Sequence, residues 1–407
     1  MKHQASGKSD VGKKRSQNED TLLLDNELGL YLVADGLGGY AAGELASQLA
    51  CETIGRVMKE GRAALDAYIR EPHIQTRAAA TRLIEVAVEE ACREVFRESE
   101  ANPEKRGMAC TVAMLILLGE HAIVAHVGDS RVYLARRGQV HQITDDHSLL
   151  TEKVRLGIVT PEQAASGRLK SAITRSVGRQ ESVQVESLHF ELMPGDKFLL
   201  CSDGLSDYMH NGQEFLDRCD HTPEQIAGEM IEFANGCGGK DNISAIVVRI
   251  EGEPEPEAFN AFSKMEVLRR LPLFEHLTFK ELMCVLNIVE LKTFETGQTV
   301  VNEGETGEEV YVSVRGRFEV RRDGQLVAEL KAGDFFGEMA LISRTTRSAN
   351  VMVMEPAVVL AIRRESFYLL LIERPVMATK LLWAFCQVLA KRLRGQADAA
   401  ADTLLLD

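Results

Sequence analysis

Five aspartates at the ends of apolar segments are the residues best placed to do chemistry in the first part of the chain. They are Asp35, Asp129, Asp203, Asp207 and Asp241. Asp35, for example, directly follows the apolar run Leu30–Ala34. A carboxylate beside a buried strand is unfavourable unless hydrogen bonds or a cation compensate its charge. If the strand ends converge, these carboxylates would repel one another strongly unless cations lie among them.

The donor atoms of this set indicate which cation would fit. All are carboxylate oxygens, and neither histidine nor cysteine stands at the matching positions. Oxygen-only sites suit magnesium, manganese or calcium rather than zinc or copper. Two such ions about 3.5–4 Å apart can activate a water molecule and stabilise an in-line displacement at phosphorus. Upstream, in "RSQNED", Arg15 precedes Glu19 and Asp20, and a guanidinium can bind two phosphate oxygens at once.

Each of these features has an ordinary explanation when it stands alone. An isolated Asp-Gly pair is usually a turn. Arg15 alone would be a solvated surface residue, and Glu19 and Asp20 alone would be surface acids. Four acid-bearing strand ends in one half of the chain are hard to explain by chance. The set therefore favours a metal-dependent reaction at phosphate.

The acids need a framework of strands and helices to bring them together. Residues 41–60 and 77–98 carry apolar residues at helical spacing and predict helices. Residues 110–140 predict several strands joined by short turns. The segments "DKFLLCSDG" and "NISAIVVRI" predict two more strands, and the run ending at Ala34 predicts another.

Five motifs occur in order along this part of the chain: "RSQNED", "VADGLGGY", "VGDSR", "CSDGLSD" and "GGKDN". With them, residues 5–250 resemble the metal-dependent serine/threonine protein phosphatases of the 2C type. The resemblance implies an α+β fold in which two packed antiparallel sheets, a β-sandwich, are flanked by helices. It also implies a hydrolase that acts on phosphoserine and phosphothreonine in proteins, with Mn²⁺ or Mg²⁺ as cofactor.

The same resemblance assigns the metal ligands. Asp35 would bridge two ions, with the carbonyl oxygen of Gly36 on one of them. Asp203 and Asp241 would complete the other ion's ligands.

Further roles follow from the same resemblance. Asp129, with Asp203 and Asp207, resembles a site for a third ion seen in family members. Glu19 would act through metal-bound water, and Arg15 would hold the substrate phosphate.

One position departs from the family pattern. Some members carry a histidine directly after the Asp-Gly pair and use it as general acid, whereas this chain has Leu37. A metal-bound water could serve as the proton donor instead. His126, in a predicted strand, and His147, in "TDDHS", are expected to be structural. Residues 148–180 resemble the flap that borders the active site in this family.

A second region follows the acidic, proline-containing segment 251–263, which predicts a linker. Regularly spaced glycines separate short alternating segments such as "EVYVSVRG", a pattern typical of a small β-barrel or roll. Residues 366–394 predict helix. The segment Gly337, Glu338, Met339 and Ala340 predicts the start of a short helix, whose free N–H groups could contact a phosphate.

A carboxylate and a guanidinium occur close together in "GEMALISRTTRSANV". The Glu338 carboxylate could accept from a ribose hydroxyl, and Arg347 could pair with a phosphate. With "FGEMAL" and "TRSANV", residues 264–395 resemble a cyclic nucleotide-binding domain, a β-roll with C-terminal helices. In that family Pro and Ala often flank the arginine, whereas here they are Thr346 and Ser348. Ser348 is expected to contact the phosphate or the base.

The resemblance implies cyclic AMP as the first choice of ligand and cyclic GMP as the second. The alternative is a degenerate domain that serves only for docking. Trp383 and Phe385 lie in the predicted C-terminal helix, and aromatic residues at helical spacing are expected in the core.

Composition and length fit a multidomain globular chain. The chain has 407 residues, of which 45% are hydrophobic, and a net charge of −14, which disfavours nucleic acid as a partner. Eight cysteines at irregular spacing, with no C-x-x-C, indicate reduced thiols. No apolar segment of signal-peptide or membrane-span length is predicted, so we expect a cytoplasmic protein without a membrane partner. The predicted boundaries are 1–250 for the phosphatase domain, 251–263 for the linker, 264–395 for the nucleotide-binding domain and 396–407 for a C-terminal tail.

The sequence therefore predicts a protein phosphatase in signal transduction, with phosphoproteins as substrates and activity regulated by a cyclic nucleotide. Two alternatives stay open. One is a phosphatase with a non-binding docking domain, and the other is a catalytically inactive cyclic nucleotide sensor. A transcription regulator is disfavoured by the acidic charge and by the absence of a predicted helix-turn-helix after the second region.

Overall fold

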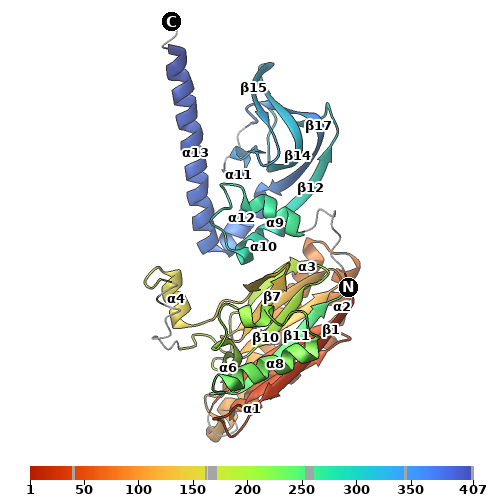
Figure 1. Ribbon diagram of the computed structural model, residues 1–407, viewed down its shortest axis with the longest axis vertical. Helices are drawn as coiled ribbons and strands as arrows, with labels where there is room; N and C mark the ends of the chain where they lie inside the picture. Colours follow the sequence, from red (N-terminus) through yellow and green to blue (C-terminus); the bar gives the residue numbers. More distant parts are fainter. Residues whose placement is uncertain (39–41, 161–162, 164–171, 253–260, 343–345, 405–407) are drawn as a thin grey trace. The chain divides into compact units, whose positions relative to one another are not determined.

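The chain divides into two compact units, Met1–Pro256 and Glu257–Asp407 (Figure 1). The computed structural model describes residues 1–38, 42–160, 163, 172–252, 261–342 and 346–404. The predicted linker 251–263 falls largely outside these described residues.

The first unit contains two antiparallel sheets that pack against each other. The strand order of one sheet is β1-β11-β10-β7-β8, and that of the other is β2-β3-β5-β6-β9, with β4 paired to β3. The strands are β1 (His3–Asp10), β2 (Asp20–Asp25), β3 (Leu30–Leu37), β4 (Ala109–Cys110), β5 (Val112–Leu118), β6 (His121–Val127), β7 (Arg131–Arg136), β8 (Gln139–Gln142), β9 (Glu186–Glu191), β10 (Lys197–Cys201) and β11 (Ile243–Ile250).

Strand β3 shows why the two sheets need covering on both sides. Leu30, Leu32 and Ala34 pack in a cluster with the helices of the unit. Tyr31 and Val33 point to the opposite face, since side chains alternate along a strand, and they are equally buried. A strand that is buried on both faces has an unbroken apolar sequence, which is what this segment has.

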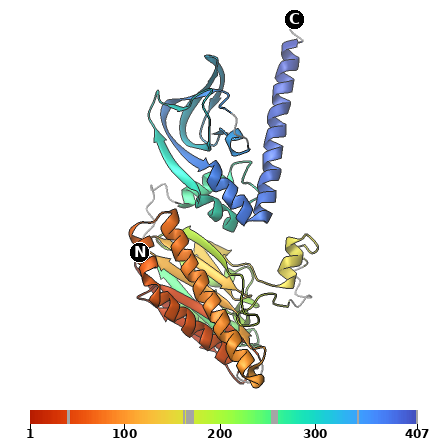
Figure 2. The same ribbon diagram turned by 180° about the vertical axis from the view of Figure 1, so that it is seen from behind.

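Helices cover the outer face of each sheet. Helices α1 (Ala42–Glu60) and α3 (Ile74–Ala101) pack on the sheet that contains β3 (Figure 2). Helix α8 (Pro223–Gly236) packs on the other sheet (Figure 1). The remaining described helices are α2 (Arg62–Arg70), α4 (Leu149–Arg155), α6 (Asp203–Ser206), α7 (Gln213–Leu216) and a 3₁₀ turn (Pro103–Lys105). This arrangement confirms the predicted helix-flanked β-sandwich.

The first and last strands of this unit are neighbours. β1 pairs with β11 over its full length, from His3 opposite Ile250 to Asp10 opposite Ile243. Beyond the strands, the Glu251 N–H donates to the Lys2 carbonyl at 2.9 Å. The two ends of the first unit therefore lie side by side.

The second unit is a β-roll with helices before and after it (Figure 1). Its strand order is β12-β17-β14-β15, with β13 paired to β17 and β16 paired to β14. The strands are β12 (Val289–Phe294), β13 (Thr299–Val301), β14 (Glu309–Arg322), β15 (Gln325–Leu330), β16 (Phe335–Phe336) and β17 (Asn350–Arg363). The helices are α9 (Ala261–Arg269), α10 (Phe279–Leu286), α11 (Met339–Ile342), α12 (Arg364–Glu373) and α13 (Pro375–Leu404). The predicted β-roll with C-terminal helices is confirmed.

The aromatic residues of α13 differ from their expected placement. Phe385 is buried, but Trp383 is 63% exposed, so the expectation that both lie in the core is wrong for Trp383. Positions that are two residues apart, such as 383 and 385, point in directions about 200° apart around the helix axis. These two side chains therefore cannot share one buried face. Although α13 has 30 residues, no helix in the described part of the chain is long and apolar enough to cross a membrane.

Candidate active site

The predicted acids of the first unit meet at one end of the two sheets. Asp35 lies in β3 directly opposite Asp20 of β2. Asp203 begins α6 just after β10, and Asp241 stands two residues before β11. Burial raises the pKa of Asp35 well above its usual value, and the charges of Asp20, Asp203, Asp129 and Asp241 raise it further. The carboxylates are therefore close enough to repel one another.

Strand β3 continues further than predicted. It was expected to end before Asp35, but it runs through Leu37 because β4 pairs with its last two residues. The strand also passes very close to its neighbours at Gly36. A Cβ atom there would lie 2.6 Å from the carbonyl oxygen of Glu19 and would clash with the carbonyl group of Gly43 at the start of α1. Only glycine permits this approach.

Several carboxyl groups in the cluster are hard to ionise without a cation. Burial raises the pKa of Asp20 and of Asp129 to about 7 and that of Asp203 to about 6. Neighbouring carboxylates add to each shift. Among the described residues, Oδ1 of Asp20 and Oδ1 of Asp129 are buried without a hydrogen-bond partner. Two such oxygens in an all-carboxylate cluster fit a hard divalent cation.

Asp20 also belongs to this carboxylate cluster, although it is not among the predicted site residues. Its side chain is only 9% exposed, and its Oδ2 accepts a hydrogen bond from the Ser202 hydroxyl at 2.8 Å. The sequence carries a signal for it, because Asp20 stands in "RSQNED" directly before the apolar residues of β2. It is thus another acid at a strand end.

The loop that carries Arg15 is held in place by Asn242, which was also not predicted. The Asn242 Nδ2 group donates to the carbonyl oxygens of Val11 at 3.0 Å and Gln17 at 2.8 Å. The Asn242 Oδ1 accepts from the Glu19 N–H at 2.9 Å. One side chain thus fixes both ends of the segment around Arg15.

Arg15 and Asp241 form the open side of the cluster. The Arg15 Nη2 donates to Asp241 Oδ2 at 2.7 Å, and the two side chains are 50% and 36% exposed. Glu19 is further inside, and burial raises its pKa while Arg15 opposes the rise. Solvent therefore reaches the cluster from the side of the guanidinium.

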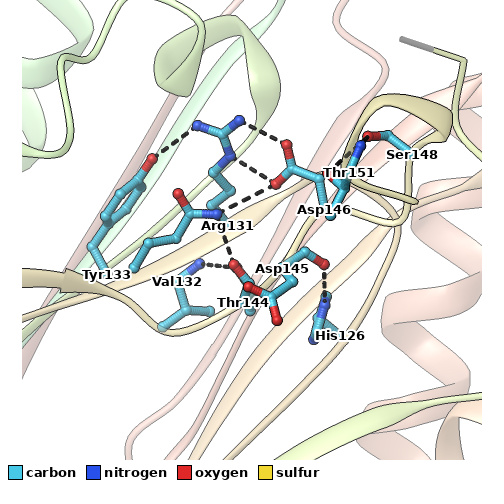
Figure 3. Close-up of polar contacts among 10 residues, drawn as sticks. His126, Arg131, Val132, Tyr133, Thr144, Asp145, Asp146, Ser148 and Thr151 are labelled. Atoms are coloured by element: carbon cyan, nitrogen blue, oxygen red, sulfur yellow. Dashed lines mark hydrogen bonds and ion pairs between the residues drawn. The ribbon is translucent and has the colours of Figure 1, made fainter. Parts of the chain in front are cut away.

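Arg131 ties the Asp129 loop to the segment before α4 (Figure 3). Its Nε donates to Asp146 Oδ1 at 2.8 Å, and its Nη2 donates to Asp146 Oδ2 at 2.7 Å. Its Nη1 donates to the Tyr133 hydroxyl at 3.1 Å. Burial raises the pKa of Asp207, and Arg131 is the main group that opposes the rise. Arg131 therefore lies beside the acids predicted for the third ion.

His126 and His147 form a buried pair at the base of the predicted flap. Their rings stack with centroids 4.6 Å apart. The His126 Nε2–H donates to the Asp145 carbonyl at 2.8 Å (Figure 3). The Gly128 N–H donates to His147 Nδ1 at 3.1 Å, and His147 Nε2 lies 3.4 Å from both Glu186 Oε1 and Arg175 Nη1.

These contacts distinguish two possible roles of His126 and His147, a metal site and a structural hydrogen-bonded group. Ligand atoms of His126, His147 and Glu186 lie within 4.8 Å of one another, as in a metal site. However, the Gly128 N–H already donates to His147 Nδ1, and the Arg175 guanidinium lies 3.4 Å from His147 Nε2 and 3.6 Å from Glu186 Oε1, where it would repel a cation. The group is therefore a hydrogen-bonded clamp at the base of residues 148–180. Within that segment, 161–162 and 164–171 lie outside the described residues.

The second unit brings the Arg347 side chain next to Gly337, the residue before Glu338. The Glu338 side chain is buried, at 6% exposure. The Arg347 Nη2 donates to the Glu309 carbonyl at 2.8 Å, and Nη1 donates to the Gly337 carbonyl at 3.3 Å. The guanidinium carbon lies 5.9 Å from the Tyr311 ring centroid. Arg347 is thus held by neutral groups.

Two glycines make room for this guanidinium. A Cβ atom at Gly307 or at Gly337 would overlap the Arg347 side chain. Gly337 also has a φ of +77°, which glycine adopts most easily. The Arg347 side chain therefore lies directly against the backbone of both glycines.

The other predicted nucleotide contacts differ in exposure. The predicted short helix is present as α11, but it starts at Met339, two residues after the predicted Gly337. Ala340 is buried, whereas Met339 is 46% exposed and Ser348 is exposed. Residues 343–345, between these positions, lie outside the described part of the chain.

Comparison with known proteins identifies the first unit. The family model described as Protein phosphatase 2C matches residues 10–232, which is more than half of the chain. The chain belongs to the protein phosphatase 2C family. A second family model, described as Cyclic nucleotide-binding domain, matches residues 291–374 of the phosphatase.

Relatives and solved structures agree with this assignment. The serine/threonine phosphatase stp of Listeria monocytogenes is 32% identical over 249 residues, which are 60% of this chain and 94% of that protein. The protein phosphatase PhpP of Streptococcus pneumoniae is 33% identical over 250 residues, 60% of this chain and 96% of its own. The serine/threonine phosphatase PstP/Ppp of Mycobacterium tuberculosis superposes with a TM-score of 0.54 at 32% identity, covering 61% of this chain and 99% of that one.

The protein is therefore a metal-dependent serine/threonine phosphatase that carries a C-terminal cyclic nucleotide-binding domain. The predicted enzyme class and family are confirmed. The individual site residues stay predictions.

Proposed function

We propose that this phosphatase hydrolyses phosphoserine and phosphothreonine in proteins under the control of a cyclic nucleotide, with cyclic AMP preferred to cyclic GMP. Catalysis is assigned to residues 1–250 and nucleotide binding to residues 264–395. The observation that carries the catalytic part is the cluster of buried carboxylates, two of which have an oxygen without a hydrogen-bond partner among the described residues.

The metal ligands we propose are those of the carboxylate cluster. Glu19, Asp35, Gly36, Asp203 and Asp241 would hold two ions, and Asp129 and Asp207 would contribute with Asp203 to a third. The raised pKa values support this, because a nearby divalent cation would relieve the repulsion that raises them. The solved structure of the PstP catalytic domain holds two manganese ions, at a TM-score of 0.51 and 30% identity over 61% of this chain and 99% of that one. Mn²⁺ or Mg²⁺ bound here would make water a nucleophile at neutral pH and polarise the phosphoryl oxygens.

Arg15 orients the substrate in this proposal. Its guanidinium exchanges the Asp241 carboxylate for two phosphate oxygens, and the exposure of both side chains leaves space for the exchange. The loop keeps its shape meanwhile, because Asn242 holds its backbone. The position after Asp35-Gly36 is Leu37, so no side chain there can protonate the leaving alkoxide. That proton comes from solvent in the site.

Cyclic nucleotide binding is assigned to the turn that contains Glu338 and Arg347. Arg347 pairs with the cyclic phosphate, Glu338 accepts from the ribose hydroxyl, and the backbone from Gly337 to Ala340 and Ser348 complete the contacts. The support is that carbonyl oxygens, not carboxylates, hold Arg347, so its positive charge is not neutralised by an ion pair in the described residues. Regulation further requires that the nucleotide binds two states of the enzyme with different affinities.

The test is hydrolysis of a phosphothreonine peptide by the full chain with Mn²⁺, with and without cyclic AMP or cyclic GMP. Asp35→Ala should abolish turnover, because it removes a buried carboxylate that would hold the ions. Arg347→Ala should keep basal turnover and lose the response to nucleotide. Turnover that ignores nucleotide would contradict regulation and leave a docking domain. Tight nucleotide binding without any turnover would contradict the catalytic part.

A further inference from the structure

Two loops form the rim around Arg15 and Asp241, and they are bonded to each other. The Lys13 N–H donates to the Gly239 carbonyl at 2.8 Å. Close by, the Lys240 N–H donates to the Tyr208 hydroxyl at 3.2 Å. Together with the bonds that Asn242 makes, these contacts fix the backbone on both sides of the Arg15 guanidinium.

The rim carries three lysines: Lys13, Lys14 and Lys240. All three are exposed, and their ammonium groups make no hydrogen bond or ion pair with any residue in the described ranges. Elsewhere in the same unit, Lys59 and Lys105 reach carboxylates at 3.0 and 2.7 Å. The three ammonium groups are therefore available to an anion that binds beside Arg15.

Lys240 immediately precedes Asp241, the carboxylate that Arg15 contacts. Lys13 is close to Lys240, because the Lys13 N–H donates to the carbonyl of Gly239, the residue before Lys240. Lys14 is the immediate neighbour of Arg15 along the chain. A phosphorylated residue bound at Arg15 would therefore lie close to the loops that carry all three lysines.

We infer that Lys13, Lys14 and Lys240 bind anionic groups that flank the phosphorylated residue, so that the enzyme prefers acidic phosphopeptides. The inference rests on the phosphatase activity and on the proposed role of Arg15. An ammonium group on a flexible stem acts as a point charge without strict geometry, so it accepts either a carboxylate or a second phosphate. Exposed charges of this kind change substrate affinity more than turnover.

The experiment compares three phosphothreonine peptides with the full chain and Mn²⁺. In the first peptide, neutral residues flank the phosphothreonine. In the second, a glutamate stands on each side of it. In the third, a second phosphothreonine nearby supplies the negative charge and the glutamates are absent. We expect kcat/KM to be about tenfold higher for the anionic peptides, mainly through KM, with the preference falling at high salt. In the triple variant Lys13→Gln, Lys14→Gln, Lys240→Gln, the ratio between anionic and neutral peptides should fall to about one.

Lys2→Gln provides the matched control. Lys2 is also exposed, but it precedes β1, whose far end leads to the site, so it lies about 25 Å away by the rise of a strand. It should leave the ratio unchanged. A larger preference for the second phosphate than for glutamate would identify a phosphorylated flank as the source of the anion.

Two results would overturn the inference. One is a wild-type enzyme that turns over all three peptides equally. The other is a triple variant that loses the same factor on every peptide and on a small phosphate ester, since the lysines would then act on the carboxylate site in general. If the wild type hydrolyses none of these substrates, the catalytic proposal itself fails, and this outcome is distinct from both.

Discussion

At the scale of single residues, Asp20 and Asp129 make the stability of the metal-free protein depend on pH. Their pKa values of about 7 in the folded state exceed the ordinary value of 3.8, so the folded form binds protons more tightly than the unfolded chain. The free energy of unfolding therefore falls as pH rises from about 4 through 7. In EDTA, we expect a Tm that is higher at pH 5.5 than at pH 8 by about 5 °C or more.

The stabilisation by Mn²⁺ should have the opposite pH dependence and increase with pH. A divalent cation competes with protons for the same oxygens, so the rise in Tm on adding Mn²⁺ should be larger at pH 8 than at pH 5.5. Differential scanning calorimetry at both pH values measures the two effects. A metal-free Tm that increases with pH would contradict this account of the carboxylates.

Asp20→Asn separates charge from shape at the same position. The amide oxygen can still accept from the Ser202 hydroxyl, but one buried charge is lost. We expect a higher metal-free Tm at pH 8 and an affinity for Mn²⁺ that is about 10–100-fold weaker, measured by calorimetric titration. Asp66→Asn, at an exposed position of α2, should change neither. Unchanged affinity in Asp20→Asn would remove Asp20 from the site.

Arg15 should matter for the substrate and not for the metal. Arg15→Ala removes both donors to the phosphate, so kcat/KM on a phosphothreonine peptide should fall about 100-fold, and Arg15→Lys should recover part of it. Binding of Mn²⁺ should be retained. The control is Arg56→Ala, which removes an exposed ion pair with Glu60 at 3.5 Å on α1. A loss of metal affinity in Arg15→Ala would mean that the guanidinium supports the carboxylates instead.

At the scale of elements, the close approach of β3 to α1 sets the shape of the carboxylate cluster. Gly36→Ala would place a methyl group against two backbone carbonyls that have little freedom to move. We expect a loss of about 1–3 kcal/mol in the free energy of unfolding by urea, together with lower activity. Gly236→Ala, near the end of α8 with no atom within 4 Å of the added carbon, should be neutral or slightly stabilising. Equal effects of the two changes would contradict the steric argument.

Strand β3 and its neighbours show which features of the site could be predicted from the sequence and which could not. Long apolar runs mark β5, β6, β10 and β11, so the acids at their ends were predictable. The end of β3 was not, because its last residues pair with β4, more than 70 positions away along the chain. The burial of Asp20 likewise depends on the pairing of β2 with β3 and on Ser202, which are tertiary contacts. Motif spacing predicted which residue types belong to the site, and long-range pairing decided which of them are buried.

At the scale of the whole molecule, each unit has its own hydrophobic core. The two clusters around α1 and α8 lie within the first unit, and a third cluster lies inside the β-roll of the second. We therefore expect residues 1–256 to fold alone and to keep metal-dependent turnover, while losing any response to nucleotide. Circular dichroism melts and peptide assays of this fragment and of the full chain test this. A fragment that does not unfold cooperatively would contradict it.

The pairing of β1 with β11 has a consequence for biosynthesis. The strand that leaves the ribosome first has no partner until residues 243–250 have emerged, and Asp241 and Asn242 of the site arrive with that partner. At about 5–20 residues per second, the gap is of the order of ten to fifty seconds. During that time the candidate active site is incomplete, and the edge of β1 is open to other strands. Since translation of the second unit follows at once, a complete phosphatase domain exists only when the second unit is already being made.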